Sequence, residues 1–217
     1  MNRVVALALR PPGSNAPAPQ DSVQALAGQG LAGDRHLDAH SPRQILIAGA
    51  AAYEDLALPP LALRENLLLD LDTRALASGT LLRVGEQAVL RLCFQCEACG
   101  SLDRERPGLA RAIDGRRGML ARVVAGGEIR AGDRVEVLDA RMPALAEDWR
   151  ERVVQVLDAL PAGMVVEYAA LARFAGVQSV YCRAFPRLLA SRGVSDKAVT
   201  ARSGSTAPRW DGSGLYD

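Results

Sequence analysis

The sequence predicts an α+β protein in which a mainly β domain precedes a small helical domain. As far as Leu138, short apolar runs alternate with glycine-containing turns, a pattern typical of closed or nearly closed β architectures. Beyond Ala140, apolar residues recur with the helical period instead. We therefore expect one domain over residues 1–140 and a second over residues 147–217, which ends in a polar tail.

The apolar runs of the first domain have the lengths and the flanking turn residues of strands. A glycine at position 85 provides the hairpin turn between two of them, and Pro59 and Pro60 end a short alanine-rich helix. A second short helix is expected over residues 107–113, and residues 11–20 are expected to form a loop. The strands are expected over residues 4–9, 44–47, 67–71, 79–83, 88–92, 119–124 and 135–138.

Three helices are expected in the second domain, over residues 148–160, 168–174 and 178–192. The first has apolar residues at i, i+3, i+4 and i+7, the spacing of an amphipathic helix. Gly176 follows the second helix as a plausible C′ residue. The third contains Pro186, which must be accommodated within it or mark a kink.

The composition excludes several classes of protein. With 49% hydrophobic residues the chain has enough apolar side chains for a large core, and with 4% aromatics that core must be aliphatic. No uninterrupted apolar stretch reaches the roughly 18 residues of a membrane span, and the N-terminal apolar run is too short for a signal peptide. A net charge of +1 argues neither for nor against nucleic acid. Four cysteines do not make a disulfide scaffold, which indicates a reducing, cytoplasmic location.

Three of the four cysteines, Cys93, Cys96 and Cys99, lie at even spacing in the stretch from residue 90 to residue 102. They follow an apolar run that is expected to be a strand. A strand fixes the backbone while the following loop supplies reach, so thiols at this position are well placed to meet a ligand. We expect one of them to be the reactive atom of a site.

The Cys-x-x-Cys-x-x-Cys spacing is open to other interpretations. A structural zinc needs four ligands, whereas the cluster supplies three and His36 and His40 lie far away in the sequence, so zinc is not favoured. The cysteines also suit ordinary buried thiols, since free cysteine is among the most buried residue types. A reducing compartment disfavours a disulfide.

Seven short stretches of the first domain carry a family resemblance. They are Gly-Asp-Arg-His at residues 33–36, Arg-Gln-Ile-Leu at 43–46, Glu-Asn-Leu at 65–67, and the segments 79–85, 99–102, 115–118 and 126–133. Each stretch alone is weak, but seven in order over about 130 residues are specific. Residues 1–138 resemble a MOSC domain, the module related to the C-terminal domain of molybdenum cofactor sulfurases.

This resemblance implies a barrel-like β fold with a cleft for a molybdopterin-type cofactor or a sulfur-bearing group. Molybdenum-ion and pyridoxal phosphate binding belong to the same family expectation. The family's single cysteine aligns with Cys99, which is then the catalytic residue and either ligates molybdenum or carries sulfur as a persulfide; a soft thiolate suits this chemistry. Cys93 and Cys96 depart from the one-cysteine pattern, leave open which sulfur reacts, and can resolve an oxidised Cys99 as a disulfide.

Six further residues are expected to bind the cofactor. The arginines among them can contact a pterin phosphate or lower the pKa of the thiol, with a solvated surface charge as the alternative for each. The asparagine can hydrogen-bond the cofactor or cap a strand turn, and the histidine can donate a proton or simply pack. Asp34 and Asp133 are expected to hold turns. The six residues are Arg35, His36, Arg43, Asn66, Arg116 and Arg117.

Residues 149–192 carry a second resemblance. Its elements are a helix, Pro-Ala-Gly at 161–163, Val-Val-Glu-Tyr at 165–168, Ala-Leu-Ala at 170–172, and an arginine within a following helix. This segment resembles the winged-helix-like DNA-binding domain of O6-alkylguanine-DNA alkyltransferases and alkyltransferase-like proteins. In that family the tyrosine and the arginine help to rotate a base out of the duplex, roles that would fall to Tyr168 and Arg183. The acceptor motif Pro-Cys-His-Arg is absent, so alkyl transfer by the usual route is excluded, and Cys182 is interpreted as a packed thiol.

The second domain also has a local excess of positive charge. Between residues 163 and 209 seven basic residues stand against two acidic ones, which suits a phosphate backbone. We expect duplex DNA to contact Tyr168, Arg183 and Arg187, the alternative being a domain that has lost DNA binding and only packs.

The leading hypothesis is therefore a MOSC-domain protein that binds a molybdenum cofactor or carries sulfur on Cys99. Its partner would be a small-molecule substrate or a sulfur donor, and as an enzyme it would reduce N-hydroxylated compounds, modified bases among them. The competing hypothesis is a non-enzymatic DNA-binding or damage-recognition protein of the alkyltransferase-like type.

Overall fold

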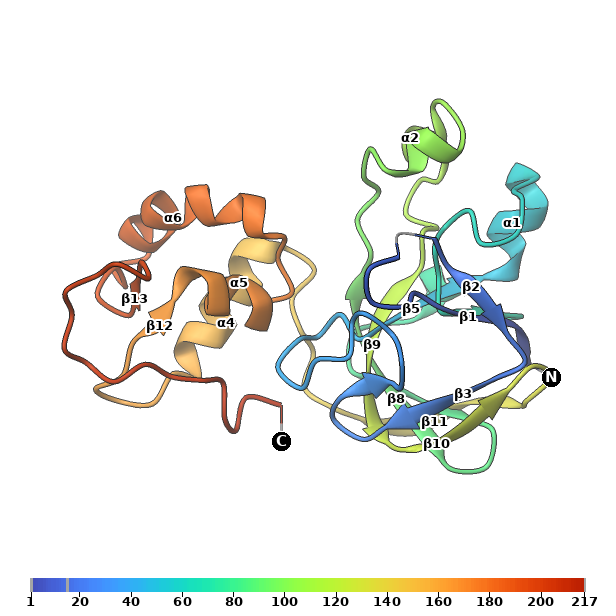
Figure 1. The fold of residues 1–217 in the computed structure, drawn as a ribbon, viewed down its shortest axis with the longest axis horizontal. Coiled ribbons are helices and arrows are strands. Elements are labelled where there is room, and N and C mark those ends of the chain that lie inside the picture. The colour runs from blue at the N-terminus through green and yellow to red at the C-terminus, as the bar shows by residue number, and fades with distance from the viewer. Residues whose placement is uncertain (1, 15, 217) are drawn as a thin grey trace. The chain divides into compact units, whose positions relative to one another are not determined.

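The computed structural model describes residues 2–14 and 16–216, which divide into two compact units. Unit 1 comprises the residues up to Ala39 together with Arg43–Ala144, and unit 2 comprises His40–Pro42 together with the residues from Leu145 on. Figure 1 shows that unit 1 is rich in strands and that unit 2 is mainly helical. In the part of the chain so described, no helix combines the length and the apolar character needed to cross a membrane.

Unit 1 contains most of the strands, which are β1 (Val4–Leu9), β2 (Ala18–Gln20), β3 (Ser22–Leu26), β4 (Gly30–Leu31), β5 (Ile45–Gly49), β6 (Leu67–Leu69), β7 (Thr80–Val84), β8 (Ala88–Gln95), β9 (Met119–Ala125), β10 (Gly127–Arg130) and β11 (Val135–Arg141). Among the described residues, eight of them form one sheet in the order β11-β7-β8-β9-β5-β6-β1-β2. Its pairs are antiparallel except for β5 with β6, and a smaller sheet has the order β10-β3-β4. This confirms the predicted α+β class and the mainly β character of the first part of the chain.

The large sheet does not close into a barrel, so of the two expected forms, closed or nearly closed, the closed one is not observed. An isolated antiparallel bridge from Arg3 to Arg134 joins the residue before β1 to the residue before β11. Next to it, the backbone N–H of Val4 donates to the carbonyl of Asp133 over 2.9 Å. The other end of β1 pairs with β2, which is the edge of the sheet. A closed barrel would need continuous hydrogen-bonded pairing between β1 and β11, but only the residues at the start of β1 approach the start of β11.

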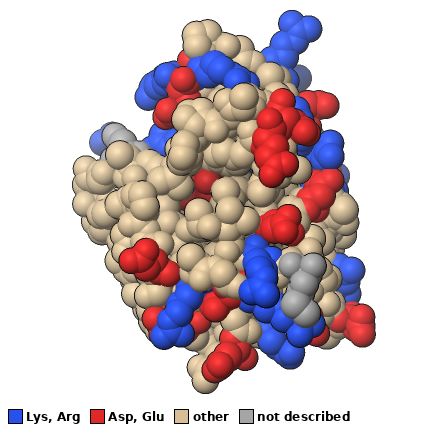
Figure 2. Space-filling view, turned by 90° about the vertical axis from the view of Figure 1, so that its right-hand side faces the viewer, with Lys and Arg blue, Asp and Glu red and all other residues tan. Residues whose placement is uncertain are grey.

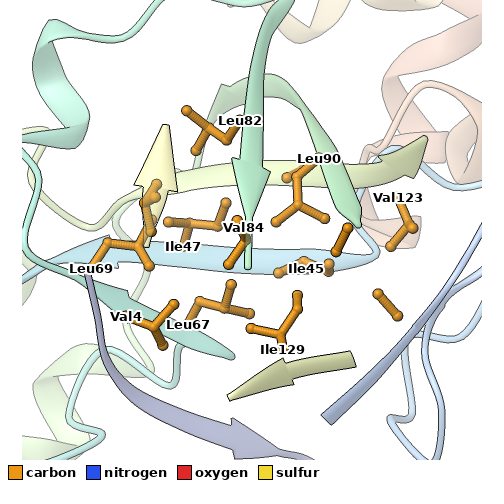
Figure 3. Close-up of a cluster of buried hydrophobic side chains, with 14 of the residues drawn as sticks. Val4, Ile45, Ile47, Leu67, Leu69, Leu82, Val84, Leu90, Val123 and Ile129 are labelled. Carbon is orange, nitrogen blue, oxygen red and sulfur yellow. The ribbon is translucent and has the colours of Figure 1, made fainter. Parts of the chain in front are cut away.

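The core of unit 1 is aliphatic, as the low aromatic content predicts. Figure 3 shows Ile45 and Ile47 of β5 in one cluster with Leu67 and Leu69 of the neighbouring β6. Alternate residues of a strand point to the same face, so these pairs cover one side of the sheet. Strands β7, β8, β9 and β10 complete the cluster with Leu82, Val84, Leu90, Val123 and Ile129.

A second hydrophobic cluster fixes the long loop that follows β8. It joins three short helices, α1 (Ala50–Leu56), α2 (Leu102–Glu105) and α3 (Leu109–Ala112). The helix predicted over residues 50–56 is confirmed, the one predicted over residues 107–113 is shorter, and α2 was not predicted. The buried members of the cluster are Ala48, Ala52, Leu58, Ala62, Leu63, Leu102, Leu109 and Ile113.

Unit 2 consists of the helices α4 (Trp149–Asp158), α5 (Tyr168–Phe174) and α6 (Phe185–Ser191), the 3₁₀-helix η2 (Ser179–Ala184), and the parallel strands β12 (Val166–Glu167) and β13 (Ala198–Val199). The Asp148 side chain caps α4 by accepting the Arg150 N–H over 2.7 Å. The prediction of one helix over residues 178–192 is wrong in one respect, because this segment is divided into η2 and α6. Pro186 consequently lies in the first turn of α6, where its missing N–H costs no hydrogen bond.

The face of the molecule seen in Figure 2 carries basic and acidic side chains that are interspersed. No extended field of one sign is visible on that face. This agrees with a net charge of only +1.

Candidate functional site

Burial separates the three clustered cysteines. Cys93 lies inside β8 and is buried, with its thiol directed at the carbonyl of Arg91. Cys96 follows the strand directly and is also buried; its backbone N–H donates to the carbonyl of Gly118 over 2.8 Å. Cys99 lies in the loop between β8 and α2 and is only partly buried. Of these three sulfurs, Cys99 is therefore the one that a ligand can reach.

Two polar side chains hold the Cys99 sulfur. Arg117 Nη1 donates to Cys99 Sγ over 2.9 Å and also to the carbonyl of Glu97 over 2.6 Å. Ser101 Oγ lies 2.9 Å from the same sulfur. Burial by itself raises the pKa of the Cys99 thiol, but the hydrogen bonds from Ser101 and Arg117 and the charge of Arg117 outweigh it and lower the pKa below its ordinary value. The thiolate, which is the nucleophile and the metal ligand, is thereby favoured.

Gly118 fixes the position of Arg117. The residue has φ +113°, and a Cβ atom there would lie 2.0 Å from the carbonyl oxygen of Ile47. The chain therefore passes β5 so closely that only glycine fits. Since β9 begins at the next residue and pairs with β5 and β8, this close approach places Arg117 beside the cysteine loop.

Replacing Arg117 with glutamine is expected to raise the pKa of Cys99, because the variant loses both the charge and the guanidinium hydrogen bond that favour the thiolate. Each unit of increase lowers the thiolate fraction near neutral pH about tenfold. The measurement is the pH profile of iodoacetamide labelling, followed on the Cys99 peptide by mass spectrometry. Arg116→Gln is the matched control, since Arg116 pairs with Asp55 instead; equal profiles for the two variants would contradict the assignment.

Asp34 is the centre of a second, buried polar group in unit 1. Its carboxylate accepts hydrogen bonds from the backbone N–H of Arg10 (2.9 Å), from Asn66 Nδ2 (2.7 Å), and from the backbone N–H and Nδ1 of His36 (2.8 and 3.0 Å). Burial acts to raise the pKa of Asp34, but these hydrogen bonds lower it to about 2. Asn66 also accepts the Leu46 N–H over 3.0 Å and donates to the Ala8 carbonyl over 3.2 Å. Asn66 therefore ties β1 to β5, and Asp34 adds the loop after β4.

Acid is expected to weaken unit 1 through Asp34. The carboxyl has a folded pKa of about 2 against an ordinary 3.8, so its contribution is complete above pH 4 and is lost as the pH falls toward 2. The shift corresponds to about 2 kcal/mol. Urea unfolding at a series of pH values should show this loss. The Asp34→Asn variant should have a lower free energy of unfolding at pH 7, and this free energy should fall less between pH 4 and pH 2. If the free energy of unfolding of that variant fell as steeply in acid as that of the unchanged protein, groups other than Asp34 would cause the loss.

Arg10 forms a basic group with two other arginines, Arg35 and Arg64. Burial lowers the pKa of Arg10, the charge of Asp34 opposes this, and the charges of Arg64 and Arg35 lower the pKa further. The Arg10 Nη2 donates to Asn66 Oδ1 over 3.4 Å, while its Nε is buried and has no hydrogen-bond partner among the described residues. The electrostatic interaction with Cys96 acts in the other direction and raises the pKa of Arg10. A buried donor without a partner next to neighbouring positive charges indicates an anion-binding position.

The structure does not bring all six predicted cofactor residues together. Arg117 contacts Cys99, and Asn66, His36 and Arg35 belong to the surroundings of Asp34 and Arg10. Arg116, by contrast, donates to the carbonyls of Ala112 and Ile113 at the end of α3. Arg43 precedes β5, at the opposite end of that strand from the close approach of Gly118.

Sequence reasoning missed Arg10 and Arg64. Arg10 directly follows β1, and Arg64 has φ +60° just before the Glu65-Asn66 pair. Two signals could have found them: Arg10 is a charged residue at the end of a buried strand, and Arg64 is a charged residue beside a recognised motif.

A comparison with family models identifies the region that contains Cys99 and Asp34. Residues 34–136 match the model of the MOSC domain. This stretch is a MOSC domain. It includes Cys99, Arg117, Asp34 and Asn66, whereas Arg10 precedes it. No curated protein matches the chain.

Solved structures share the fold. YuaD from Bacillus subtilis has a TM-score of 0.54 and 22% identity, covering 63% of this chain and 96% of its own. YiiM from Escherichia coli has a TM-score of 0.53 and 20% identity, covering 88% and 94%. YiiM from Geobacillus stearothermophilus has a TM-score of 0.54 and 18% identity, covering 87% and 100%. At these identities the likeness shows the fold of the MOSC domain and its surroundings, and function must be argued from the site.

Proposed function

We propose that the MOSC domain binds a molybdopterin-type molybdenum cofactor, with the Cys99 thiolate as the protein ligand of the molybdenum. The observation that carries this proposal is a partly exposed thiol whose sulfur is held by Arg117 and Ser101 and whose pKa is lowered. A metal-binding cysteine must be deprotonated, and a soft thiolate suits molybdenum bound to sulfur. One protein thiolate is enough when the cofactor brings its own ligands.

The basic group around Arg10 fits the rest of such a cofactor. Molybdopterin carries a phosphate, and Arg10, Arg35 and Arg64 supply neighbouring guanidinium groups that match phosphate oxygens. The buried Nε of Arg10 is a donor that a bound anion would satisfy. Asn66 and Asp34 hold this group in place through the hydrogen bonds that join β1, β5 and the loop after β4.

Two other cofactors fit the site less well. Pyridoxal phosphate is held by a lysine Schiff base, but the sequence has a single lysine, Lys197, which lies in unit 2 and donates to the carbonyl of Leu157. Structural zinc needs four ligands, and no group of three or more His, Cys, Asp or Glu side chains suited to a metal exists within residues 2–14 and 16–216.

The reaction that we propose is the reduction of an N-hydroxylated small molecule. A bound molybdenum cofactor would supply the two-electron chemistry: the N–O bond breaks, two protons are taken up, the oxygen leaves as water, and an external electron donor returns the two electrons. In this chain Arg117 and Ser101 lower the pKa of Cys99 and so favour its thiolate, and the lowered pKa of Asp34 keeps a fixed negative charge beside Arg10. His36, whose Nδ1 contacts Asp34, is positioned to exchange a proton with solvent through its partly exposed ring.

A second candidate function uses the same thiolate. Cys99 would carry sulfur as a persulfide: its thiolate would attack the outer sulfur of a donor persulfide, the S–S bond of the donor would break, and the donor thiolate would leave. The group around Arg10 favours the cofactor over this candidate, because a persulfide carrier has no use for a buried anion site.

Metal analysis and native mass spectrometry of the full-length protein, purified from a host that makes molybdopterin, test the proposal. The expected result is molybdenum near one atom per chain together with a mass gain equal to the cofactor. A gain of one sulfur atom on Cys99 without molybdenum would support the persulfide carrier instead. Protein with neither addition, or with zinc in their place, would contradict both functions.

A further inference from the structure

One tyrosine hydroxyl ties helix α1 to the loop that carries Arg64. Tyr53 lies in the middle of α1, and its Oη donates to the Glu65 carboxylate, 2.7 Å from each of the two oxygens. The same Oη accepts the backbone N–H of Leu63 over 3.1 Å. Leu63 and Glu65 are the neighbours of Arg64 in the sequence. The hydroxyl therefore fixes the chain on both sides of that arginine.

The backbone of this loop is strained. Leu61 has φ +62° and Arg64 has φ +60°, the left-handed conformation that a residue with a Cβ atom rarely adopts. The Arg64 N–H donates to the Leu61 carbonyl over 2.8 Å, which closes a local turn but does not attach that turn to the rest of unit 1. Strained backbone persists only where the surrounding structure holds it. Tyr53 provides such a hold from a helix outside the loop.

Both attachment points of the hydroxyl are buried. Leu63 is fully buried, and Glu65 is 1% exposed. The Glu65 carboxylate accepts hydrogen bonds from Tyr53 and from its own backbone N–H. Burial raises the pKa of Glu65 and also that of Tyr53, so the tyrosine keeps the proton that it donates at neutral pH. Removing the hydroxyl would take a hydrogen-bond partner from a buried N–H and from a buried carboxyl.

The loop leads directly into the anion-binding group. Asn66 comes two residues after Arg64 and accepts a hydrogen bond from Arg10 Nη2 over 3.4 Å. Asn66 is held without Tyr53, because its backbone N–H donates to the Leu46 carbonyl over 2.8 Å and its side chain accepts the Leu46 N–H over 3.0 Å. Arg64 has its effect on Arg10 through its charge. In this segment Arg64 is therefore the residue whose position depends on the hydroxyl.

We propose that Tyr53 is a positioning residue of the anion-binding group, and that its hydroxyl holds the loop so that the Arg64 guanidinium completes a phosphate site with Arg10. This role rests on the proposed function, in which Arg10, Arg35 and Arg64 bind the phosphate of the cofactor. Tyr53 acts through the backbone on either side of Arg64 and not by contact with the phosphate. Its removal lowers the affinity for phosphate without changing the charge of the arginines.

The test is isothermal titration calorimetry of the full-length protein with inorganic phosphate, using protein from a host that does not make molybdopterin. Tyr53→Phe removes only the hydroxyl and should weaken phosphate binding about tenfold, as should Arg64→Gln, because a hydrogen bond between charged groups contributes about this much. The double variant should bind phosphate no more weakly than Arg64→Gln alone, since Tyr53 acts through Arg64. A general loss of structure would instead add to the effect of Arg64→Gln.

Tyr181→Phe is the matched control, since it removes a tyrosine hydroxyl from unit 2, and its phosphate affinity should equal that of the unchanged protein. Urea unfolding measures the stability of each variant. If Tyr53→Phe alone does not fold, adding Glu65→Met replaces both partners by apolar groups of similar shape, which costs little stability. Leu63 still lacks its acceptor in that protein, so phosphate binding should remain weak.

Unchanged phosphate affinity in folded Tyr53→Phe protein would overturn the role of Tyr53 and leave the proposed function standing. An equal loss in Tyr181→Phe would overturn it as well, and so would a further tenfold loss when Tyr53→Phe is added to Arg64→Gln. If the unchanged protein does not bind phosphate, both the role of Tyr53 and the anion site of the proposed function are wrong.

Discussion

Replacing Gly118 with alanine is expected to destabilise unit 1 by at least about 3 kcal/mol, or to prevent it from folding. A Cβ atom at this position would lie 2.0 Å from the carbonyl oxygen and 2.9 Å from the carbonyl carbon of Ile47. Both atoms belong to the backbone of the central strand β5, which is fixed on either side by β9 and β6. No flexible side chain can move aside, so β9 would have to separate from β5.

Gly115→Ala separates this steric effect from the cost of the backbone conformation. Gly115 lies three residues earlier with φ +72°, and an added Cβ atom would meet nothing within 4 Å. It should therefore cost only about 1 kcal/mol, the penalty for a non-glycine residue in the left-handed region. Urea unfolding of the two variants measures the difference. Similar free energies of unfolding would show that the close approach to Ile47 is not what limits position 118.

Replacing Cys99 with alanine is expected to reduce the molybdenum content by at least tenfold and to abolish reductase activity. The thiol is partly exposed and belongs to neither of the two hydrophobic clusters of unit 1, so the fold should persist. The loss would follow from removing the one reachable sulfur of the cysteine cluster, whose thiolate Arg117 and Ser101 favour. Activity and metal content are measured together on the same preparation.

Cys93→Ala and Cys96→Ala are the matched controls for this prediction. Both side chains are buried, so each variant should be somewhat less stable yet retain the cofactor. If Cys99→Ala kept full activity while Cys96→Ala lost it, the reactive sulfur would be the one beside Arg10. In that case the basic group of Arg10, Arg35 and Arg64 would keep its role, and the reactive sulfur would be at the end of β8.

Much of the fold could be predicted because the longer strands carry their own signals. The strand over residues 4–9 and the helices over residues 50–56 and 168–174 were predicted with the bounds that the structure has. Strands β2, β3, β4 and β10 were missed, because they are short and their extended conformation depends on pairing with other strands. For example, β10 lies in a stretch where no strand was expected and is held there by pairing with β3.

The candidate site was predictable only in part. Cys99 and Arg117 lie in short motifs of the MOSC domain, so the resemblance pointed to both. Arg116 and Arg117 were equally good candidates from the sequence, and only the direction of each guanidinium distinguishes them. Arg10 is brought to Asn66 by the pairing of β1 with β6, across 56 residues of sequence, and no local pattern reveals such a contact.

The most direct test of the central claim is the X-ray absorption spectrum of molybdenum in the purified full-length protein. If Cys99 Sγ ligates the metal, the spectrum will contain one sulfur ligand beyond those that the cofactor itself supplies. Selective blocking of Cys99 with iodoacetamide before reconstitution should then prevent cofactor uptake. Molybdenum with only the sulfur ligands of the cofactor, or uptake that is unaffected by blocking Cys99, would contradict the account.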